Sequence, residues 1–100
     1  MVEFLKKCDV KEETINELIK SQDSSFLFDL NSNEEECINI INYFKEIGIK
    51  DIDELLLYES ELFFKTIKKI KYAFSKFDID EFVELINQDY NNISDIYRFL

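Results

Sequence analysis

The sequence predicts an all-α fold: a short stack of helix-turn-helix repeats with end-capping helices. Gly occurs once and Pro does not occur, so few residues would interrupt helices. Apolar residues recur at helical spacing and do not alternate as they would in strands. The apolar pattern also repeats after 30 residues, and periods of about 20–50 residues are typical of stacked repeats. We expect about two and a half units.

The 30-residue repeat relates apolar positions of two consecutive segments. We expect paired positions to be equally buried, because each unit of a stack packs against its neighbours in the same way. Truncating Leu55 or Leu85 to Ala is therefore expected to cost a similar free energy of unfolding. The pairs are Cys37 and Ile67, Ile40 and Ile70, Phe44 and Phe74, Ile47 and Phe77, Ile49 and Ile79, Ile52 and Phe82, Leu55 and Leu85, and Leu56 and Ile86.

A chain of 100 residues has the size of one compact domain. Within this single small helical-repeat domain we expect four parts. They are a degenerate N-terminal unit at 1–31, a repeat at 32–60, a second repeat at 61–91 and a C-terminal cap at 92–100.

The N-terminal unit departs most from the repeat. Residues 2–7 are expected to form one or two helical turns, and Asp9 with Glu12 has the spacing of a capping box. The residues at 26–30 are too apolar for a free linker and should pack against the next helix. The inward positions of this unit are expected at Ile15, Leu18, Ile19, Phe26, Leu27, Phe28 and Leu30.

The first full repeat should begin with Ser32, which forms a capping box with Glu35. Gly48 should end this long helix, because glycine accepts the left-handed C-cap conformation without steric cost. A short helix from about 50 to 58 would follow, its acidic first turn favoured by the helix dipole. The inward stripes are expected at Cys37, Ile40, Ile41, Phe44 and Ile47, and at Ile52, Leu55 and Leu56.

The second repeat is expected to copy the first. Ser60 would cap a long helix, Asp78 would take the place of Gly48, and Asp80 would open a short helix through Asn87. Ser94 would then start a final short helix that closes the stack. The inward residues are expected at Phe63, Ile67, Ile70, Phe74 and Phe77 in the long helix, and at Ile96, Tyr97 and Leu100 in the last.

Residues 43–49, followed by Ile52, Leu55 and Leu56, resemble the repeat of the mitochondrial transcription termination factor (mTERF-like) family. Its pattern is roughly F-L-x-x-x-G-φ-x-x-x-x-φ-x-x-L-φ, followed by a turn containing proline. Residues 73–86 fit with Asp78 in place of glycine, and the proline is absent.

The resemblance covers residues 34–100 and implies a stack of helical repeats. In that family several repeats form a curved superhelix whose concave, basic face binds nucleic acid. The resemblance therefore implies the fold, and its nucleic-acid function conflicts with the charge of this chain.

The chain is strongly acidic, with 22 Asp and Glu against 12 Lys and Arg and a net charge of −10. Binding to duplex phosphates needs a surplus of basic residues on one face, so the overall charge disfavours nucleic acid and anionic membranes. Solubility, a basic protein partner or imitation of a nucleic acid's charge would each use an acidic surface.

The N-terminal residues do not form a basic segment followed by an apolar stretch, and no apolar run approaches membrane-spanning length. We therefore expect a cytoplasmic protein without a membrane partner. In such a reducing compartment Cys8 and Cys37 would act as small buried hydrophobic residues, and Cys37 shares its repeat position with Ile67.

The candidate binding face lies opposite the apolar stripe of the second long helix. At about 100° per residue, four lysines and one tyrosine fall on one arc of that helix. Such a strip can contact phosphate or an acidic protein. The alternative is an ordinary solvated face. The five residues are Lys65, Lys68, Lys69, Tyr72 and Lys76.

The sequence offers little chemistry for catalysis. It has no His, a single Arg and no Gly-rich phosphate loop, so we expect neither an enzyme nor a cofactor. Two isolated cysteines do not make a metal site. The acidic tetrapeptides at 51–54 and 78–81 lack the ligand spacing of a calcium loop and are interpreted as helix starts.

Together these observations favour a small cytoplasmic protein–protein interaction module whose partner is another protein. The alternative is a nucleic-acid-associated protein, which would use either the lysine strip or an acidic surface that imitates nucleic acid. A self-associating structural subunit is a third hypothesis, and the sequence does not determine the oligomeric state.

Overall fold

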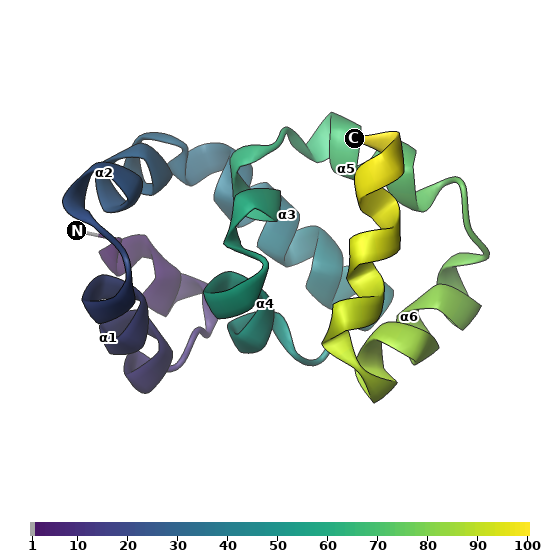
Figure 1. The fold of residues 1–100 in the computed structure, drawn as a ribbon, viewed down its shortest axis with the longest axis horizontal. Coiled ribbons are helices and arrows are strands. Elements are labelled where there is room, and N and C mark those ends of the chain that lie inside the picture. Colours follow the sequence, from purple (N-terminus) through teal and green to yellow (C-terminus); the bar gives the residue numbers. More distant parts are fainter. Residues whose placement is uncertain (1) are drawn as a thin grey trace.

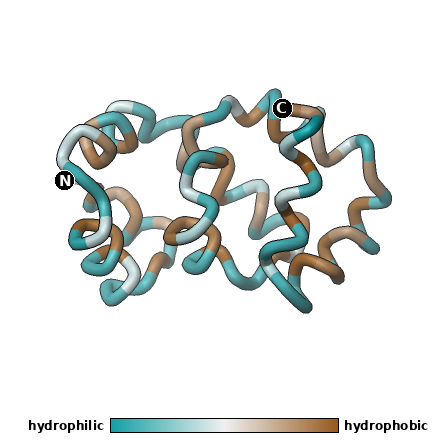
Figure 2. The backbone as a smooth tube through the Cα atoms, viewed as in Figure 1, coloured by the Kyte–Doolittle hydropathy of each residue, from teal (hydrophilic) through white to brown (hydrophobic). Residues whose placement is uncertain are grey.

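The computed structural model describes residues 2–100, and these form helices and turns without a strand. The all-α class predicted from the sequence is confirmed (Figure 1). Along the helices, apolar and polar stretches alternate (Figure 2), as expected for amphipathic helices around one core. In chain order the elements are the 3-10 helix η1 (Glu3–Cys8), α1 (Glu12–Ser21), α2 (Ser24–Ser32), α3 (Glu34–Ile47), α4 (Ile52–Tyr58), the 3-10 helix η2 (Ser60–Phe64), α5 (Ile67–Phe74), α6 (Ile79–Gln88) and the 3-10 helix η3 (Tyr90–Phe99).

Helix α3 is the centre of the fold. It packs against η1, α2, α4, η2, α5 and α6, and it crosses the middle of the molecule in Figure 1. The ring of Phe44, a residue of α3, has its centroid 5.8 Å from the ring centroids of both Phe63 and Phe74. All three side chains are fully buried. As the sequence predicts, the buried stripe of α3 includes Cys37, Ile40, Ile41 and Phe44.

Three α-helices follow one another along the 36 Å long axis of the molecule, in the order α1, α4, α6 (Figure 1). Similar hydrogen bonds link consecutive members of this row. The backbone N–H of Lys11, just before α1, donates to Asp53 of α4 at 3.0 Å, and the N–H of Lys50, just before α4, donates to Asn87 of α6 at 2.9 Å. Two α-helices followed by a 3-10 helix occur in 34–64 and again in 67–99. The count of two and a half units stays a prediction.

Gly48 ends α3, as the sequence predicts. Its φ of 97° lies in the left-handed region, where a side chain is disfavoured. The N–H of Gly48 donates to the carbonyl of Lys45 at 3.1 Å, and the N–H of Ile49 donates to the carbonyl of Phe44 at 2.9 Å. This pair of hydrogen bonds is a Schellman motif. The motif turns the chain so that Ile49 is buried and α4 begins three residues later.

The two expected capping boxes are wrong. Ser32 is the last residue of α2, a helix that the sequence analysis did not identify, and Asn33 precedes α3. Helix α2 forms because Asp23 caps it, with Oδ1 accepting the Phe26 N–H at 2.8 Å. Asp9 does not cap α1 either: it follows η1 at φ 64°, and its carboxylate pairs with Lys45 at 3.0 Å.

The second long helix predicted between Ser60 and Phe77 is also wrong, because the chain breaks at Lys65 and Thr66. Residues before the break form η2, and Thr66 caps α5 by accepting the Lys69 N–H at 3.2 Å. Glu36 of α3 stabilises the break, since its carboxylate accepts the Ile67 N–H at 2.8 Å. Phe63 is buried as expected, but it belongs to η2.

Two further helix ends differ from the expectation. Asp78 does not end α5, because that helix stops at Phe74. The φ of Asp78 is −71°, and Asp78 caps α6 by accepting the Glu81 N–H at 3.2 Å. Ser94 does not start the last helix, because η3 begins after Asp89, which accepts the Asn91 N–H at 3.0 Å. In both places a helix begins where an aspartate carboxylate accepts a backbone N–H of the first turn that has no partner within the helix.

Three residues expected in the core are exposed: Ile19, Leu85 and Phe28. Leu85 contrasts with Leu55, its partner in the 30-residue repeat, because Leu85 is 44% exposed and Leu55 is fully buried. Helix α4 packs between α1, α3 and η2, whereas α6 packs on α3 and η3 and is the last helix of the row (Figure 1). Equal burial at equivalent positions therefore fails at the end of the molecule.

This difference gives a prediction for stability. Leu55→Ala should lower the free energy of unfolding by about 2–5 kcal/mol, because it deletes buried methyl groups and leaves a cavity. Leu85→Ala should lower it by less than about 1 kcal/mol, because its side chain is already partly in water. Urea denaturation of both variants measures the difference. Equal losses of unfolding free energy in the two variants would contradict the prediction, because they would show that the Leu85 side chain is buried as fully as that of Leu55.

Candidate functional site

The candidate binding face of lysines is divided by the structure. Lys68, Lys69 and Tyr72 lie on α5, whereas Lys65 lies in the break before this helix and Lys76 follows its end. Tyr72 is 55% exposed, and the Lys76 ammonium lies 4.6 Å from the centre of its ring. Lys76 is therefore engaged in a cation–π contact with Tyr72.

Three of these residues line a hollow on the surface beside α5. Its volume is about 580 Å³, and its other walls come partly from the end of η3. Phe99 and Leu100 were not part of the sequence-based candidate, because nothing in the spacing along α5 reveals which distant residues pack beside it. The lining residues are Thr66, Lys68, Lys69, Tyr72, Phe99 and Leu100, so Lys65 and Lys76 lie outside the hollow.

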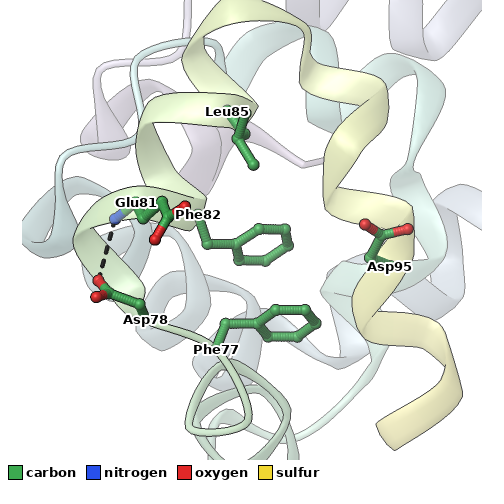
Figure 3. A pocket seen from close by; sticks show the side chains of 6 residues that line it. All are labelled: Phe77, Asp78, Glu81, Phe82, Leu85 and Asp95. Atoms are coloured by element: carbon green, nitrogen blue, oxygen red, sulfur yellow. Dashed lines mark hydrogen bonds between the residues drawn. The ribbon is translucent and has the colours of Figure 1, made fainter.

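A second hollow, of about 260 Å³, lies between α6 and η3 (Figure 3). The rings of Phe77 and Phe82 stack at its base, with centroids 4.2 Å apart and planes 11° from parallel. Leu85 points into the same space from the next turn of α6. We call this site the α6–η3 groove; it is lined by Phe77, Asp78, Glu81, Phe82, Leu85 and Asp95.

Three acidic residues line the groove beside this apolar floor, and the Asp78 carboxylate is turned toward the start of α6 (Figure 3). Asp78 and Glu81 lie at the start of α6, and Asp95 faces them from η3 (Figure 3). Asp78 accepts the N–H of Glu81, and this is the cap of α6. Among residues 2–100, no Lys or Arg pairs with any of the three, and the carboxylates of Glu81 and Asp95 accept no hydrogen bond. The groove is therefore apolar inside and negative at its rim.

The α6–η3 groove was not predicted from the sequence. The repeat assigned Leu85 to the core and placed Phe77 within a long helix, so neither looked available for binding. One signal could have found the site: residues 78, 81, 82 and 85 have the spacing of a single helix face that combines apolar and acidic side chains. Acidic side chains on such a face remain in contact with water only where no further helix packs over them.

The two cysteines are buried and not paired with each other in a disulfide, and their burial was predicted correctly. Burial raises the pKa of the Cys37 thiol to about 12 and also raises the pKa of Cys8. Since the thiolate is the reactive form, neither is suited to nucleophilic chemistry near neutral pH. Burial and a 2.9 Å hydrogen bond to Glu59 raise the pKa of Tyr97, which therefore stays protonated as a structural contact.

In the described part of the chain, no group of three or more Cys, Asp or Glu residues is arranged to hold a metal ion. No helix there is long and apolar enough to cross a membrane.

Comparisons with protein-family models, curated proteins and solved structures find no match to this chain. The resemblance to the mitochondrial transcription termination factor repeat therefore stays a proposal.

Proposed function

We propose that this chain is a small cytoplasmic protein–protein interaction module that performs no catalysis. The observation that carries the proposal is the α6–η3 groove, where exposed Leu85 and the half-buried ring of Phe77 lie beside the buried ring of Phe82 in an apolar hollow. Scattered apolar side chains on a surface need no explanation, but apolar side chains gathered in a hollow are typical of a contact site.

The position of the groove supports the same proposal. In a stack of helical units, the end of the row presents a helix face that a further element would cover. Helix α6 ends the row formed by α1, α4 and α6 (Figure 1), and its outer residue Leu85 is exposed where the corresponding Leu55 is buried. A partner protein that docks there would bury the face that the chain itself leaves open.

Photo-crosslinking tests the proposal. A photoreactive amino acid in place of Leu85 should form a covalent adduct with another protein when native host cells are irradiated, because the groove brings the partner into contact. Exposed Glu17 of α1 is the matched control position and should form no comparable adduct. Gel shifts and mass spectrometry identify the products.

The proposal fails if position 85 forms no adduct, or if positions 85 and 17 capture the same proteins equally. An adduct with a second copy of this chain would instead support the third hypothesis, a self-associating structural subunit.

A second candidate function is association with nucleic acid, as the family resemblance implies. One observation favours it: Lys68 and Lys69 flank the exposed Tyr72 around a hollow, and an aromatic ring between cations can stack a base beside phosphate. The other form of this alternative is imitation of phosphates by the acidic surface, which would act through a protein that normally binds nucleic acid.

We predict that the chain does not bind nucleic acid directly, because its net charge of −10 opposes counterion release from phosphates. Labelled duplex and single-stranded DNA and RNA are titrated at about 50 mM salt, where phosphate contacts are strongest. Micromolar binding that falls steeply with salt and is lost when Lys65, Lys68, Lys69 and Lys76 become Glu would establish the second function instead.

A further inference from the structure

We infer that the α6–η3 groove accepts a cationic amphipathic helix of a partner protein. This inference rests on the proposed function and adds the chemistry of the partner. Apolar side chains of that helix would contact Phe77, Phe82 and Leu85, and its Lys or Arg residues would pair with the carboxylates at the rim.

The shape of the groove favours a helix. One of its walls is a stripe that starts at Asp78, the N-cap of α6, and continues along the helix through Glu81, Phe82 and Leu85, which are spaced three, four and seven residues from the first. Such a stripe runs along the helix for about 10 Å, or two turns. Asp95 on η3 forms the facing wall (Figure 3). A seam between two packed helices receives a third helix through side chains at matching spacing.

The volume argues against a small molecule as the occupant. Pockets for small molecules usually exceed about 300 Å³ and enclose most of the ligand. The α6–η3 groove holds about 260 Å³ and opens to solvent. It therefore fits an anchoring side chain that belongs to a larger partner.

The negative charge at the rim of the groove favours a partner of positive charge. Glu81 and Asp95 approach the groove from two elements, Asp78 lies beside them as the cap of α6, and no Lys or Arg among residues 2–100 pairs with any of the three. The net charge of −10 adds to this local negative potential. A cationic helix would be attracted at long range and would relieve the repulsion among the carboxylates, whereas an anionic helix would be repelled.

A second copy of the chain fits less well. Each copy carries a net charge of −10, so the negative rim of the groove would repel a second copy as a whole. We therefore assign the groove to a different protein.

The test uses two labelled peptides designed as amphipathic helices with identical leucine positions. One carries Lys at its polar positions and the other carries Glu. Fluorescence anisotropy should show that the intact protein binds the Lys peptide, more weakly as salt rises from about 50 to 150 mM, and does not bind the Glu peptide. Sedimentation run in parallel should show no self-association.

Two variants locate the binding. Glu81→Lys/Asp95→Lys should weaken binding of the Lys peptide by about tenfold or more, because two attractive charges become repulsive. Leu85→Ala should weaken it by about fivefold, because part of the apolar floor is lost. The matched control Glu13→Lys/Glu17→Lys makes the same change in net charge on exposed positions of α1 and should leave the affinity nearly unchanged.

Four results would overturn the inference: no binding of the Lys peptide, equal binding of the Glu peptide, equal weakening by the control variant, or self-association through the groove. Circular dichroism confirms that each variant is folded. If the Lys peptide does not bind but the photoreactive residue at position 85 still captures a protein, the inferred chemistry is wrong and the interaction module stands.

Discussion

The packing of three phenylalanine rings around α3 is the contact on which the rest of the structure depends. Phe44 of α3 touches Phe63 of η2 and Phe74 of α5, and all three are fully buried. Six of the other elements pack against α3, so residues from both ends of the chain share one core. Because a core of this kind tolerates little change in volume, the elements around α3 are held in one arrangement.

Polar side chains near the start of α3 determine where its neighbours break. Asn33 donates to the carbonyl of Phe63 at 2.9 Å, and Glu36 accepts the N–H of Ile67 at 2.8 Å. These two bonds lie on either side of the break between η2 and α5. They satisfy a carbonyl and an amide that a continuous helix would have used internally. At the other end of α3, Gly48 turns the chain so that α4 packs against α3.

The sequence predicted those features that depend on local chemistry. The helical period, the Gly48 turn and the buried stripes of α3 and α4 need only nearby residues, and they were correct. The break at Thr66 depends on a carboxylate 30 residues away, so no local pattern revealed it. The exposure of Leu85 depends on α6 being last in its row, and a repeat alone does not say where a row ends. A local pattern can likewise group the lysines around Tyr72, a grouping that stays a prediction, but it cannot show the α6–η3 groove, whose walls come from separate elements.

The central role of α3 can be tested by native-state hydrogen exchange in Phe44→Leu, a variant that reduces the shared ring contacts while keeping the site apolar. The account predicts that amides in α1 and in α6 lose the same amount of protection, about 1–2 kcal/mol, because both ends unfold together with one core. Loss of protection in only one of these helices would contradict it, since the two ends of the chain would then be independently stable.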